Sequence, residues 1–342
     1  MAFEVATPAH LQKVGTGTDG WNLSSEYIQV ANIDMQGLTR NRIGTDANPF
    51  TGKYDGDGYT ISNLSNSQAV DYVGLFGYAS GAEFTNIRLY DVTMTGGYYT
   101  GGLVGYASSC TITGCYVSGS VTSTIWYAGG VSGRVDATTI TKSWFKGTVH
   151  ADSNAGGLVA YSSVSNINNC FARASVSAND AGAGSYSGGL VGFQNQGSIT
   201  NCYAAGTVSG SETNRGAIGI VYAPATTSRV YFDRTLSGFS SGAYASPRTT
   251  DEMTFPENFT TTYITWDFET IWTHDPSYTI NDGYPHFEGG FRIWVNKSPN
   301  PSFLPPLWLD WKVVPTLWVY KEFAWKPITG VWVRKGDEWK SI

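Results

Sequence analysis

The chain repeats one short phrase, Gly-Gly-Leu-Val-Gly followed by an aromatic residue, at nearly constant intervals. The steps are 28, 28, 27, 32 and 27 residues, counted from the second glycine of each copy: Gly74, Gly102, Gly130, Gly157, Gly189 and Gly216. A repeat of this length cannot bury an apolar face by itself, so it must stack on its neighbours. The sequence therefore predicts a solenoid rather than one globular core.

Each repeat also has a second half that is rich in β-branched and aromatic residues and bounded by Gly, Ser and Asn. Its copies are the segments 111–121, 139–149, 166–176 and 198–208. This composition is typical of short strands and turns, and no segment has a helical period long enough to cross over a sheet. We therefore expect a parallel β-helix with about one coil per repeat and about six coils in all.

In a parallel β-helix, equivalent residues of successive coils stack at about 4.8 Å. One inward aliphatic column is then expected from Leu75, Leu103, Val131, Leu158 and Leu190, and another from Ile112, Ile140, Ile167 and Ile199. The glycines of the phrase are expected to provide positive φ at the corners.

The phrase Gly188-Gly-Leu-Val-Gly192, followed by Ser198-Ile-Thr-Asn-Cys-Tyr-Ala-Ala-Gly-Thr-Val208, resembles the GLUG repeat family. That family occurs in large bacterial surface proteins and in some phage-encoded ones. The lead-in segment 50–61 and the exit segments 248–253 and 281–285 are similar to theirs. The resemblance implies an all-β fold, a right-handed parallel β-helix, but it implies no particular chemistry.

Changes in composition divide the chain into four predicted regions. They are an N-terminal cap with the first coils (1–70), the GLUG-repeat β-helix (71–221), the closing coils with a C-terminal cap (222–288), and a small tryptophan-rich β module (289–342). A cap is expected because a first coil would otherwise expose strand edges.

Within the N-terminal region, Pro8–Val14 is expected as a short helix and Glu26–Ile33 as a strand. The run Asp55-Gly-Asp-Gly58 is expected as a tight turn. A calcium loop is the alternative, but the remaining ligands of such a loop are missing from the sequence.

Charge and hydropathy exclude some partners. Charged residues make up only 14% of the chain and the net charge is −6, which argues against nucleic acid or an anionic membrane. The N-terminus lacks the features of a secretory signal, and no stretch approaches about 20 apolar residues, so no membrane insertion is expected. We expect a virion protein that is released by lysis; an extracellular or cell-surface protein whose signal has been removed is the alternative.

Three of the four cysteines occupy one repeat position. Cys115, Cys170 and Cys202 each follow the second glycine of their repeat by 13 residues, whereas Cys110 lies outside that register. We expect them to stack as free, small apolar residues, with a metal or disulfide role as the alternative.

The C-terminal region repeats Trp-Lys and Trp-Val pairs. Its tryptophans are Trp294, Trp311, Trp318, Trp325, Trp332 and Trp339. About 50 residues have too little volume to bury so many indoles, so the module is predicted to form a homotrimer or to attach to other tail proteins. It resembles the tryptophan-repeat modules at the ends of phage tail and baseplate proteins. An autonomous β-meander with exposed aromatics is the alternative.

The sequence offers little for catalysis. The solenoid acids share no register that pairs two carboxylates, and the histidines, His10, His150, His274 and His286, lie in no metal-binding or nucleophile motif. We therefore predict no catalytic residue, no metal and no cofactor, although a site formed between subunits stays open.

Aromatic residues in the turns just before the Gly-Gly phrase are the candidate ligand contacts. They are Tyr98, Tyr99, Trp126, Tyr127 and Tyr186. Trp144, which lies outside these turns, is a further candidate. Aromatic rings beside Asn and Ser suit sugars, because C–H faces stack on rings while amides and hydroxyls bind sugar hydroxyls. Some of these rings would instead cap the ladder.

The prediction is a structural and receptor-binding component of a phage tail, a fibre or spike that recognises host surface carbohydrate without covalent chemistry. A polysaccharide depolymerase on the same β-helix and a fragment of a bacterial surface adhesin are the alternatives.

Overall fold

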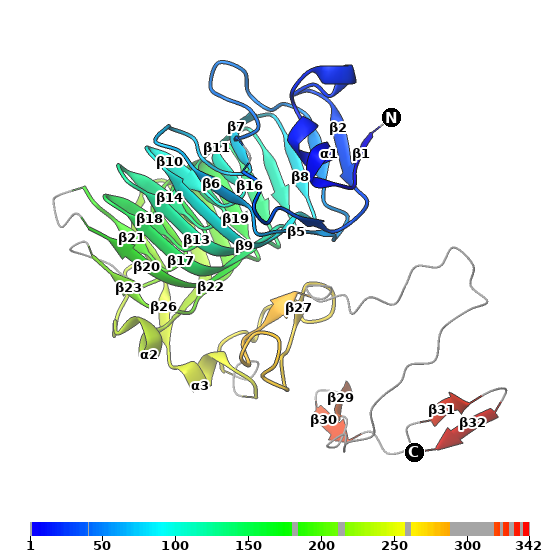
Figure 1. Ribbon diagram of the computed structural model, residues 1–342. Helices are drawn as coiled ribbons and strands as arrows, with labels where there is room; N and C mark the ends of the chain where they lie inside the picture. Colours follow the sequence, from blue (N-terminus) through cyan, green and yellow to red (C-terminus); the bar gives the residue numbers. More distant parts are fainter. Residues whose placement is uncertain are drawn as a thin grey trace. The chain divides into compact units, whose positions relative to one another are not determined.

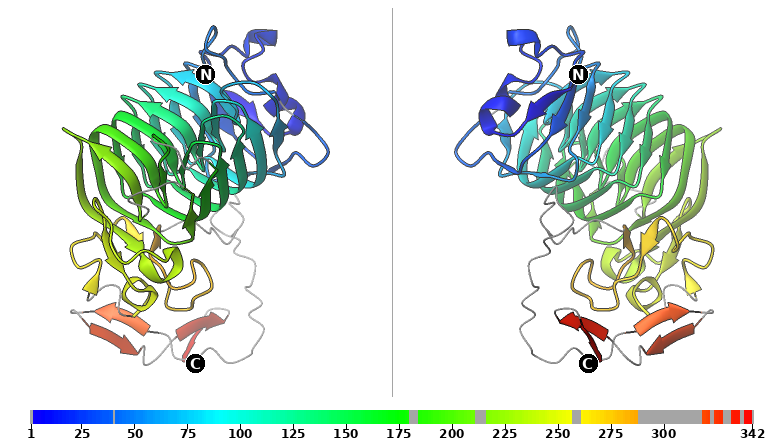
Figure 2. Two further views of the ribbon diagram at one scale, coloured as in Figure 1. Left: turned by 90° about the vertical axis from the view of Figure 1, so that its left-hand side faces the viewer. Right: turned by 90° about the vertical axis from the view of Figure 1, so that its right-hand side faces the viewer.

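The computed structural model describes residues 2–39, 41–179, 184–210, 216–256 and 261–287, together with the strands 318–321, 324–327, 332–335 and 338–341. The chain divides into two compact units, Met1–Phe291 and Arg292–Ile342. The first unit is a parallel β-solenoid of about eight turns in its described residues (Figures 1 and 2). The predicted all-β parallel β-helix is confirmed.

The strands of successive coils pair in register in parallel stacks. The first stack contains β7 (Phe76–Ser80), β11 (Val104–Ser108), β15 (Ser132–Asp136), the first parts of β19 (Val159–Asn168) and β22 (Val191–Ala204), and β24 (Ile218–Tyr222). The second contains β1 (Phe3–Val5), β2 (Glu26–Gln29), β4 (Lys53–Asp55), β8 (Glu83–Thr85), β12 (Thr111–Thr113), β16 (Thr139–Thr141), later parts of β19 and β22, and the start of β25 (Thr226–Asp233).

The third stack continues each coil past the next corner. It contains β3 (Ile33–Asp34), β5 (Thr60–Ser62), β9 (Arg88–Gly96), β13 (Tyr116–Ser123), β17 (Trp144–Ala151), β20 (Phe171–Ala178), the ends of β22 and β25, and β26 (Ser246–Arg248), with β6 (Ser65–Ser67) and β23 (Val208–Ser209) alongside. A separate short sheet precedes the Gly-Gly phrase and consists of β10 (Tyr99–Gly101), β14 (Tyr127–Gly129), β18 (Asn154–Gly156) and β21 (Ser187–Gly188).

The expectation of about six coils is too low. Coils begin before the first Gly-Gly phrase, since Tyr27 pairs with Tyr54 and Tyr54 pairs with Phe84 in the second stack. The segment expected as one strand at Glu26–Ile33 is divided between β2 and β3 by a corner. These coils lack the phrase from which the coils were counted.

The predicted aliphatic columns are confirmed. Ile112, Ile140, Ile167 and Ile199 pair in register and are fully buried. The leucine and valine column is also buried, with at most 1% of any member exposed: Leu75, Leu103, Val131, Leu158 and Leu190. Each such side chain contributes about 1.5–3 kcal/mol through burial, so the columns form the core that runs through the coils.

The expected reason for the paired glycines is wrong. Neither Gly102 nor Gly130 has a positive φ. A Cβ on Gly130 would lie 2.1 Å from the Phe145 ring and 2.3 Å from the carbonyl oxygen of Gly157. The second glycine therefore leaves room for the next coil and for an inward ring, and does not serve to turn the chain.

Left-handed backbone occurs instead at the turn between the first and second stacks. Equivalent residues of five coils have φ between 46° and 66°: Gly81, Ser109, Ala137, Val164 and Gln196. Val164 is β-branched, so this conformation is strained, and its side chain is 53% exposed and lacks compensating burial.

The cysteines are buried and free. Cys115, Cys170 and Cys202 lie in the expected column, which Ser143 completes. The backbone N–H of Cys170 donates to Sγ of Cys202 (3.4 Å), and that of Cys115 donates to Oγ of Ser143 (3.1 Å). Burial raises the pKa of Cys115 to about 12, so these thiols act as packing groups.

The N-terminal cap contains the expected helix, α1 (Pro8–Lys13), which begins at the N-cap residue Thr7, and a 3₁₀ turn, η1 (Thr18–Gly20). At Asp55–Gly58 the chain makes a tight turn in which the N–H of Asp57 donates to Oδ1 of Asp55 (2.9 Å). None of the helices in the described ranges is long and apolar enough to span a membrane.

The C-terminal part of the first unit folds back along the outside of the third stack. It contains α2 (Arg234–Ser237), α3 (Thr250–Met253) and the antiparallel pair β27 (Trp272–Thr273) and β28 (His286–Phe287). Its aromatic residues cover an outward aromatic column. The buried members of the joint cluster are Phe171, Tyr203, Ala205, Met253, Tyr263, Trp266, Trp272, Tyr284 and Phe287. It is therefore a lateral clamp as well as an end cap.

Hydrogen bonds fasten this clamp to the solenoid. The hydroxyl of Tyr203 donates to the carbonyl oxygen of Pro285 (2.7 Å), and Nδ2 of Asn281 donates to the Tyr203 oxygen (2.7 Å). The hydroxyl of Tyr284 donates to the buried Asp233. The exit motif of the sequence thus holds the clamp in place.

The second unit contains two antiparallel hairpins in its described strands. They are β29 (Trp318–Lys321) with β30 (Ala324–Pro327), and β31 (Trp332–Lys335) with β32 (Glu338–Ser341). The register pairs Tyr320 with Trp325 and Arg334 with Trp339, so the two hairpins repeat one pattern. Trp294 and Trp311 lie outside the described residues.

Replacing Val164 with Asn should stabilise the protein by about 1 kcal/mol, because Asn adopts the left-handed conformation more readily than Val. Thermal unfolding of the two proteins measures this. Val70→Asn is the matched control: Val70 is 37% exposed without a positive φ, and its replacement should not raise the melting temperature. An unchanged or lowered melting temperature for V164N would contradict the account.

The clamp should weaken in acid through Asp275. Burial would raise the pKa of this carboxylate, but the N–H groups of Asn281 (2.7 Å) and Gly283 (3.1 Å) and the Ser277 hydroxyl hold it below its usual value. A depressed folded-state pKa gives stability that is present above about pH 4 and lost as pH falls further.

Asp275→Asn should therefore destabilise the clamp by about 1–3 kcal/mol at pH 7, with a difference from the native protein that shrinks toward pH 3. Tryptophan fluorescence during unfolding follows the clamp through Trp266 and Trp272. Asp251→Asn, at an exposed acid of the same region, is the control. A difference that does not change with pH would be inconsistent with this role.

Candidate functional site

Two neighbouring columns of side chains, one before and one after the Gly-Gly phrase, form a continuous aromatic surface on the first unit. The residues that directly follow the phrase are in register on five successive coils and form one column. The residues that lie shortly before the phrase are also in register and form the other column. We call this surface the tyrosine face, and its members are Tyr72, Tyr99, Tyr127, Asn154 and Tyr186 before the phrase and Tyr78, Tyr106, Arg134, Tyr161 and Phe193 after it.

Most rings of the tyrosine face stack on one another along the solenoid. Tyr99 and Tyr127 have centroids 5.2 Å apart and planes 4° apart, and Tyr72 stacks on Tyr99 at 5.4 Å. Tyr161 and Phe193 stack at 4.7 Å. Since in-register coils bring equivalent rings together, the faces of the stacked rings are largely in contact with neighbouring rings.

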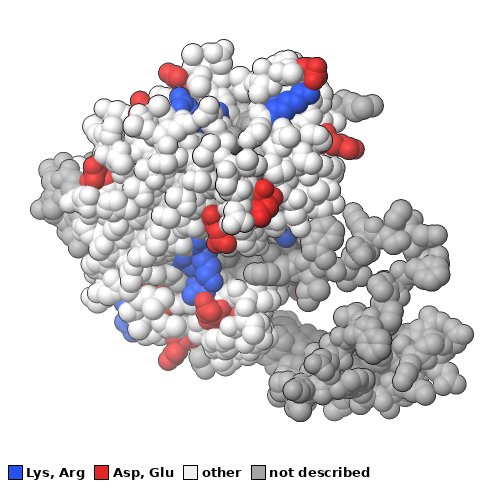
Figure 3. All heavy atoms as spheres, viewed as in Figure 1, with Lys and Arg blue, Asp and Glu red and all other residues white. Residues whose placement is uncertain are grey.

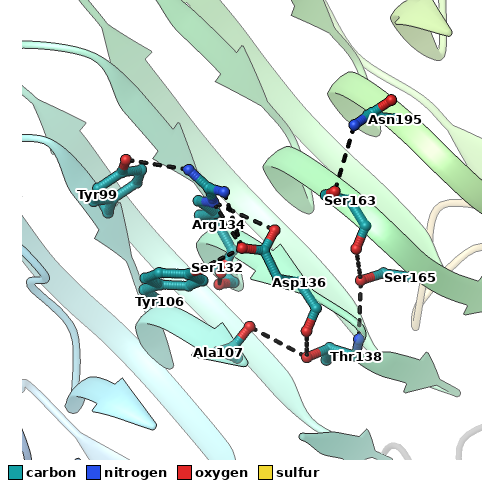
Figure 4. Close-up of polar contacts among 10 residues, drawn as sticks. All are labelled: Tyr99, Tyr106, Ala107, Ser132, Arg134, Asp136, Thr138, Ser163, Ser165 and Asn195. Carbon is teal, nitrogen blue, oxygen red and sulfur yellow. Dashed lines mark hydrogen bonds and ion pairs between the residues drawn. The ribbon is translucent and has the colours of Figure 1, made fainter. Parts of the chain in front are cut away.

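Arg134 takes the place of a ring in the second column (Figure 4). Its Cζ lies 4.7 Å from the Tyr161 ring centroid and 5.1 Å from that of Tyr106, so the guanidinium lies against an aromatic ring on each neighbouring coil. As Figure 4 shows, its Nη2 lies 2.9 Å from Oδ2 of Asp136, and Nη1 donates to the Tyr99 hydroxyl at 3.4 Å. The cation is thus neutralised within the face.

Asp136 also accepts a hydrogen bond from the Tyr106 hydroxyl. Burial and the adjacent Asp136 carboxylate raise the pKa of Tyr106 above its usual value. For Arg134, burial would lower the pKa, but Asp136 raises it above its usual value. Both groups keep their protons at physiological pH, so this network is a fixed, net neutral part of the surface.

The structure brings all five predicted ligand contacts to this side of the solenoid, but in two roles. Tyr99, Tyr127 and Tyr186 belong to the tyrosine face. Within it, a hydrogen bond with Tyr222 raises the pKa of Tyr186. Tyr98 and Trp126 lie further out, with 38% and 47% exposed and ring centroids 5.7 Å apart. Only these two offer much ring surface to a ligand.

The second column of the tyrosine face was not expected from the sequence. Tyr78, Tyr106, Tyr161 and Phe193 each close the repeated phrase, so the repeat itself contained the signal. Arg134 breaks that pattern in the one copy that ends in Gly-Arg, and its ring contacts depend on the neighbouring coils.

A further cavity lies where the clamp meets the third stack, with a volume of about 60 Å³. It is lined by residues that include Tyr116, Trp144, Lys146, Asn281 and Phe287. This volume admits a few water molecules but not a sugar ring. Trp144 lies on this other face and stacks on Phe171 at 5.5 Å, so it is a contact of the clamp.

Two acidic residues of the described part, Asp136 and Asp233, form structural contacts. Asp136 pairs with Arg134, and the buried Asp233 accepts hydrogen bonds from the N–H groups of Thr235 and Leu236 and from the Thr250 hydroxyl. Within the described ranges, no group of three or more His, Cys, Asp or Glu residues is arranged to hold a metal ion.

These features define the chain as a parallel β-solenoid with an outward aromatic face. The model of the GLUG motif matches residues 96–122 and 183–209, so the solenoid is built in part from GLUG motifs. Over 91 residues, 26% of this chain, the sequence is 36% identical to Halomucin from Haloquadratum walsbyi. The match spans only 1% of the length of Halomucin.

Two solved structures share the fold. One, described as a candidate immunoglobulin A1 protease from Bacteroides ovatus, has a TM-score of 0.54 and 19% identity over 84% of this chain and 92% of its own. The other, described as an IgA1 protease, has a TM-score of 0.55 and 19% identity over 71% of this chain and 21% of its own. At this identity the likeness concerns the fold alone.

Proposed function

We propose that this protein is a non-catalytic rod that recognises surface carbohydrate, as the structural and receptor-binding component of a phage tail fibre or spike. The observation that carries the proposal is the exposed pair Tyr98 and Trp126 on a rigid solenoid, beside Ser153 of the next coil. Aromatic rings with adjacent hydroxyl and amide groups are the usual means of binding sugars.

The surrounding surface supports this proposal. Charged side chains are sparse on the face seen in Figure 3, and charged residues make up only 14% of the chain. Uncharged hydroxyl-rich surfaces suit a ligand that is itself made of hydroxyl groups. The fixed Arg134–Asp136 pair adds polar contacts to this face without a net charge.

A cell-surface or secreted adhesin is the second candidate function. The match to Halomucin favours it, since part of the repeat is shared with that protein. Both candidates use the same face for binding, and they differ in where the protein is displayed. Detection of the protein in purified phage particles supports the first, and detection in the cell envelope of a producing bacterium supports the second.

The full chain should bind glycans without cleaving them. On an array of bacterial surface polysaccharides, we expect retention that Tyr98→Ala reduces by about tenfold, which corresponds to about 1.4 kcal/mol of lost stacking. Incubation with a bound polysaccharide should release neither reducing ends nor unsaturated sugar. Release of either product would favour the depolymerase alternative, and absence of all binding would contradict the proposal.

We also propose that the tryptophan-rich module holds chains together as a trimer. The two hairpins repeat one register in which Tyr320 and Arg334 each pair with a tryptophan, as expected for a repeated assembly element.

Light scattering should give about three times the chain mass of 36.9 kDa for the full protein. A chain that ends at Phe291, where the first unit ends, should be monomeric, with an unchanged β-sheet circular dichroism signal. A monomer in both cases would contradict trimer formation and favour attachment to another tail protein.

A further inference from the structure

We propose that the carbohydrate site is centred on Trp126 and selects uncharged sugars over acidic ones. This inference rests on the proposed carbohydrate recognition and narrows it to one corner of the solenoid and one class of glycan. The corner is the turn between the third stack and the Gly-Gly phrase, where successive coils differ most in sequence.

Equivalent positions of this corner change from rings to hydroxyls along the solenoid. Tyr98 and Trp126 precede the paired residues Tyr99 and Tyr127, so they occupy the same position on adjacent coils. The next two coils have Ser153 and Ser185 there, with hydroxyl oxygens 3.3 Å apart. The aromatic pair therefore ends at Trp126 and is followed by small polar side chains.

This change leaves one side of the indole without an aromatic neighbour. In the described part of the chain, the ring contacts of Trp126 are with Tyr98, at 5.7 Å, and with the edge of Tyr127, also at 5.7 Å. Its side chain is 47% exposed. A sugar ring stacked on the indole toward the next coil would lie beside the Ser153 hydroxyl.

Asp152 adds a second polar side chain to the coil that follows Trp126. Asp152 precedes Ser153, and its Oδ1 accepts a hydrogen bond from Nδ2 of Asn179 at 2.8 Å. A carboxylate with a second free oxygen can accept hydrogen bonds from sugar hydroxyls. The corner thus combines a stacking surface on one coil with a hydroxyl and a carboxylate on the next.

The negative charge near the ring pair distinguishes neutral glycans from acidic ones. The ring pair lies between two acids, since Oδ1 of Asp71 accepts from the N–H of Tyr98 at 3.2 Å and Asp152 lies on the other side. Neither acid forms an ion pair with a described Lys or Arg residue. Arg134, the cation of the tyrosine face, is neutralised by Asp136.

An acidic sugar in this site would face uncompensated negative charge. A carboxylate about 8 Å from each acid in water-like surroundings would lose about twofold to threefold in affinity per acid, and two acids together would give about fourfold to ninefold. Uncharged sugars have no such penalty. The site should therefore prefer neutral hexose and N-acetylhexosamine glycans to uronates and sialates.

Calorimetry on the full chain tests the site. The neutral probes are maltoheptaose, mannopentaose and chitopentaose, and the acidic probes are pentagalacturonate and an α2,8-linked sialic acid hexamer. We expect Trp126→Ala to weaken the tightest neutral probe by about tenfold. Tyr278→Ala is the matched control, because Tyr278 is also an exposed aromatic, with 48% exposed, and it lies in the clamp, outside the tyrosine face. Its loss should leave binding unchanged.

The double variant Asp71→Asn, Asp152→Asn tests the charge selection. It keeps the side-chain shape and exchanges one acceptor oxygen of each acid for an NH2 donor. It should therefore strengthen binding of pentagalacturonate by about fourfold to ninefold, with neutral binding changed by less than that. High salt should reduce the gain, because salt screens exposed charges.

The outcomes separate the inference from the proposed function. Acidic probes that bind the native chain as tightly as neutral ones, or neutral binding that survives in W126A, would overturn the inference while carbohydrate recognition stands. A native chain that binds neither class would overturn both. Thermal unfolding of each variant ensures that a loss of binding is not a loss of fold.

Discussion

The in-register hydrogen bonding of each coil to the next is the interaction on which the rest of the structure depends. Because parallel pairing aligns equivalent residues, every position of the repeat becomes a column. In the core of the solenoid, Ile167 pairs with Ile199 and both side chains are buried. On its outer surface, Tyr161 pairs with Phe193 and the two rings stack. Paired glycines are needed where one coil's backbone approaches the next, as at Gly130.

The features that the sequence predicts well are those that recur in every repeat. The spacing of the Gly-Gly phrase and of Ile112 and its equivalents was sufficient for the parallel β-helix and its core, because periodic positions become columns. The early coils around Tyr27 and Tyr54 were missing from the predicted number of coils. They pair in the same register as the later coils but do not contain the Gly-Gly phrase, from which the coils were counted.

Other features depend on contacts between positions that no period relates. The hydrogen bond from Tyr203 to Pro285 joins residues 82 apart, and the clamp that it fastens could not be predicted from spacing. The ring contacts of Arg134 arise because its neighbours on both coils are aromatic. For the candidate site, the sequence located the corner but did not separate stacked rings from exposed ones.

That separation has a functional consequence. Rings such as Tyr99 and Tyr127 stack on each other and stabilise the surface, so their faces are not free for a ligand. Trp126 differs because serines follow it in its column, and its indole remains half exposed. In a solenoid, a binding site can thus arise where a column of like side chains ends.

The most direct measurement is a crystal structure of the protein with a bound neutral oligosaccharide, obtained by soaking with the probe that binds tightest in solution. The account predicts a sugar ring stacked on Trp126, with hydroxyl groups within hydrogen-bond distance of Asp152 and Ser153. A sugar bound elsewhere on the solenoid, with Trp126 unoccupied, would contradict it.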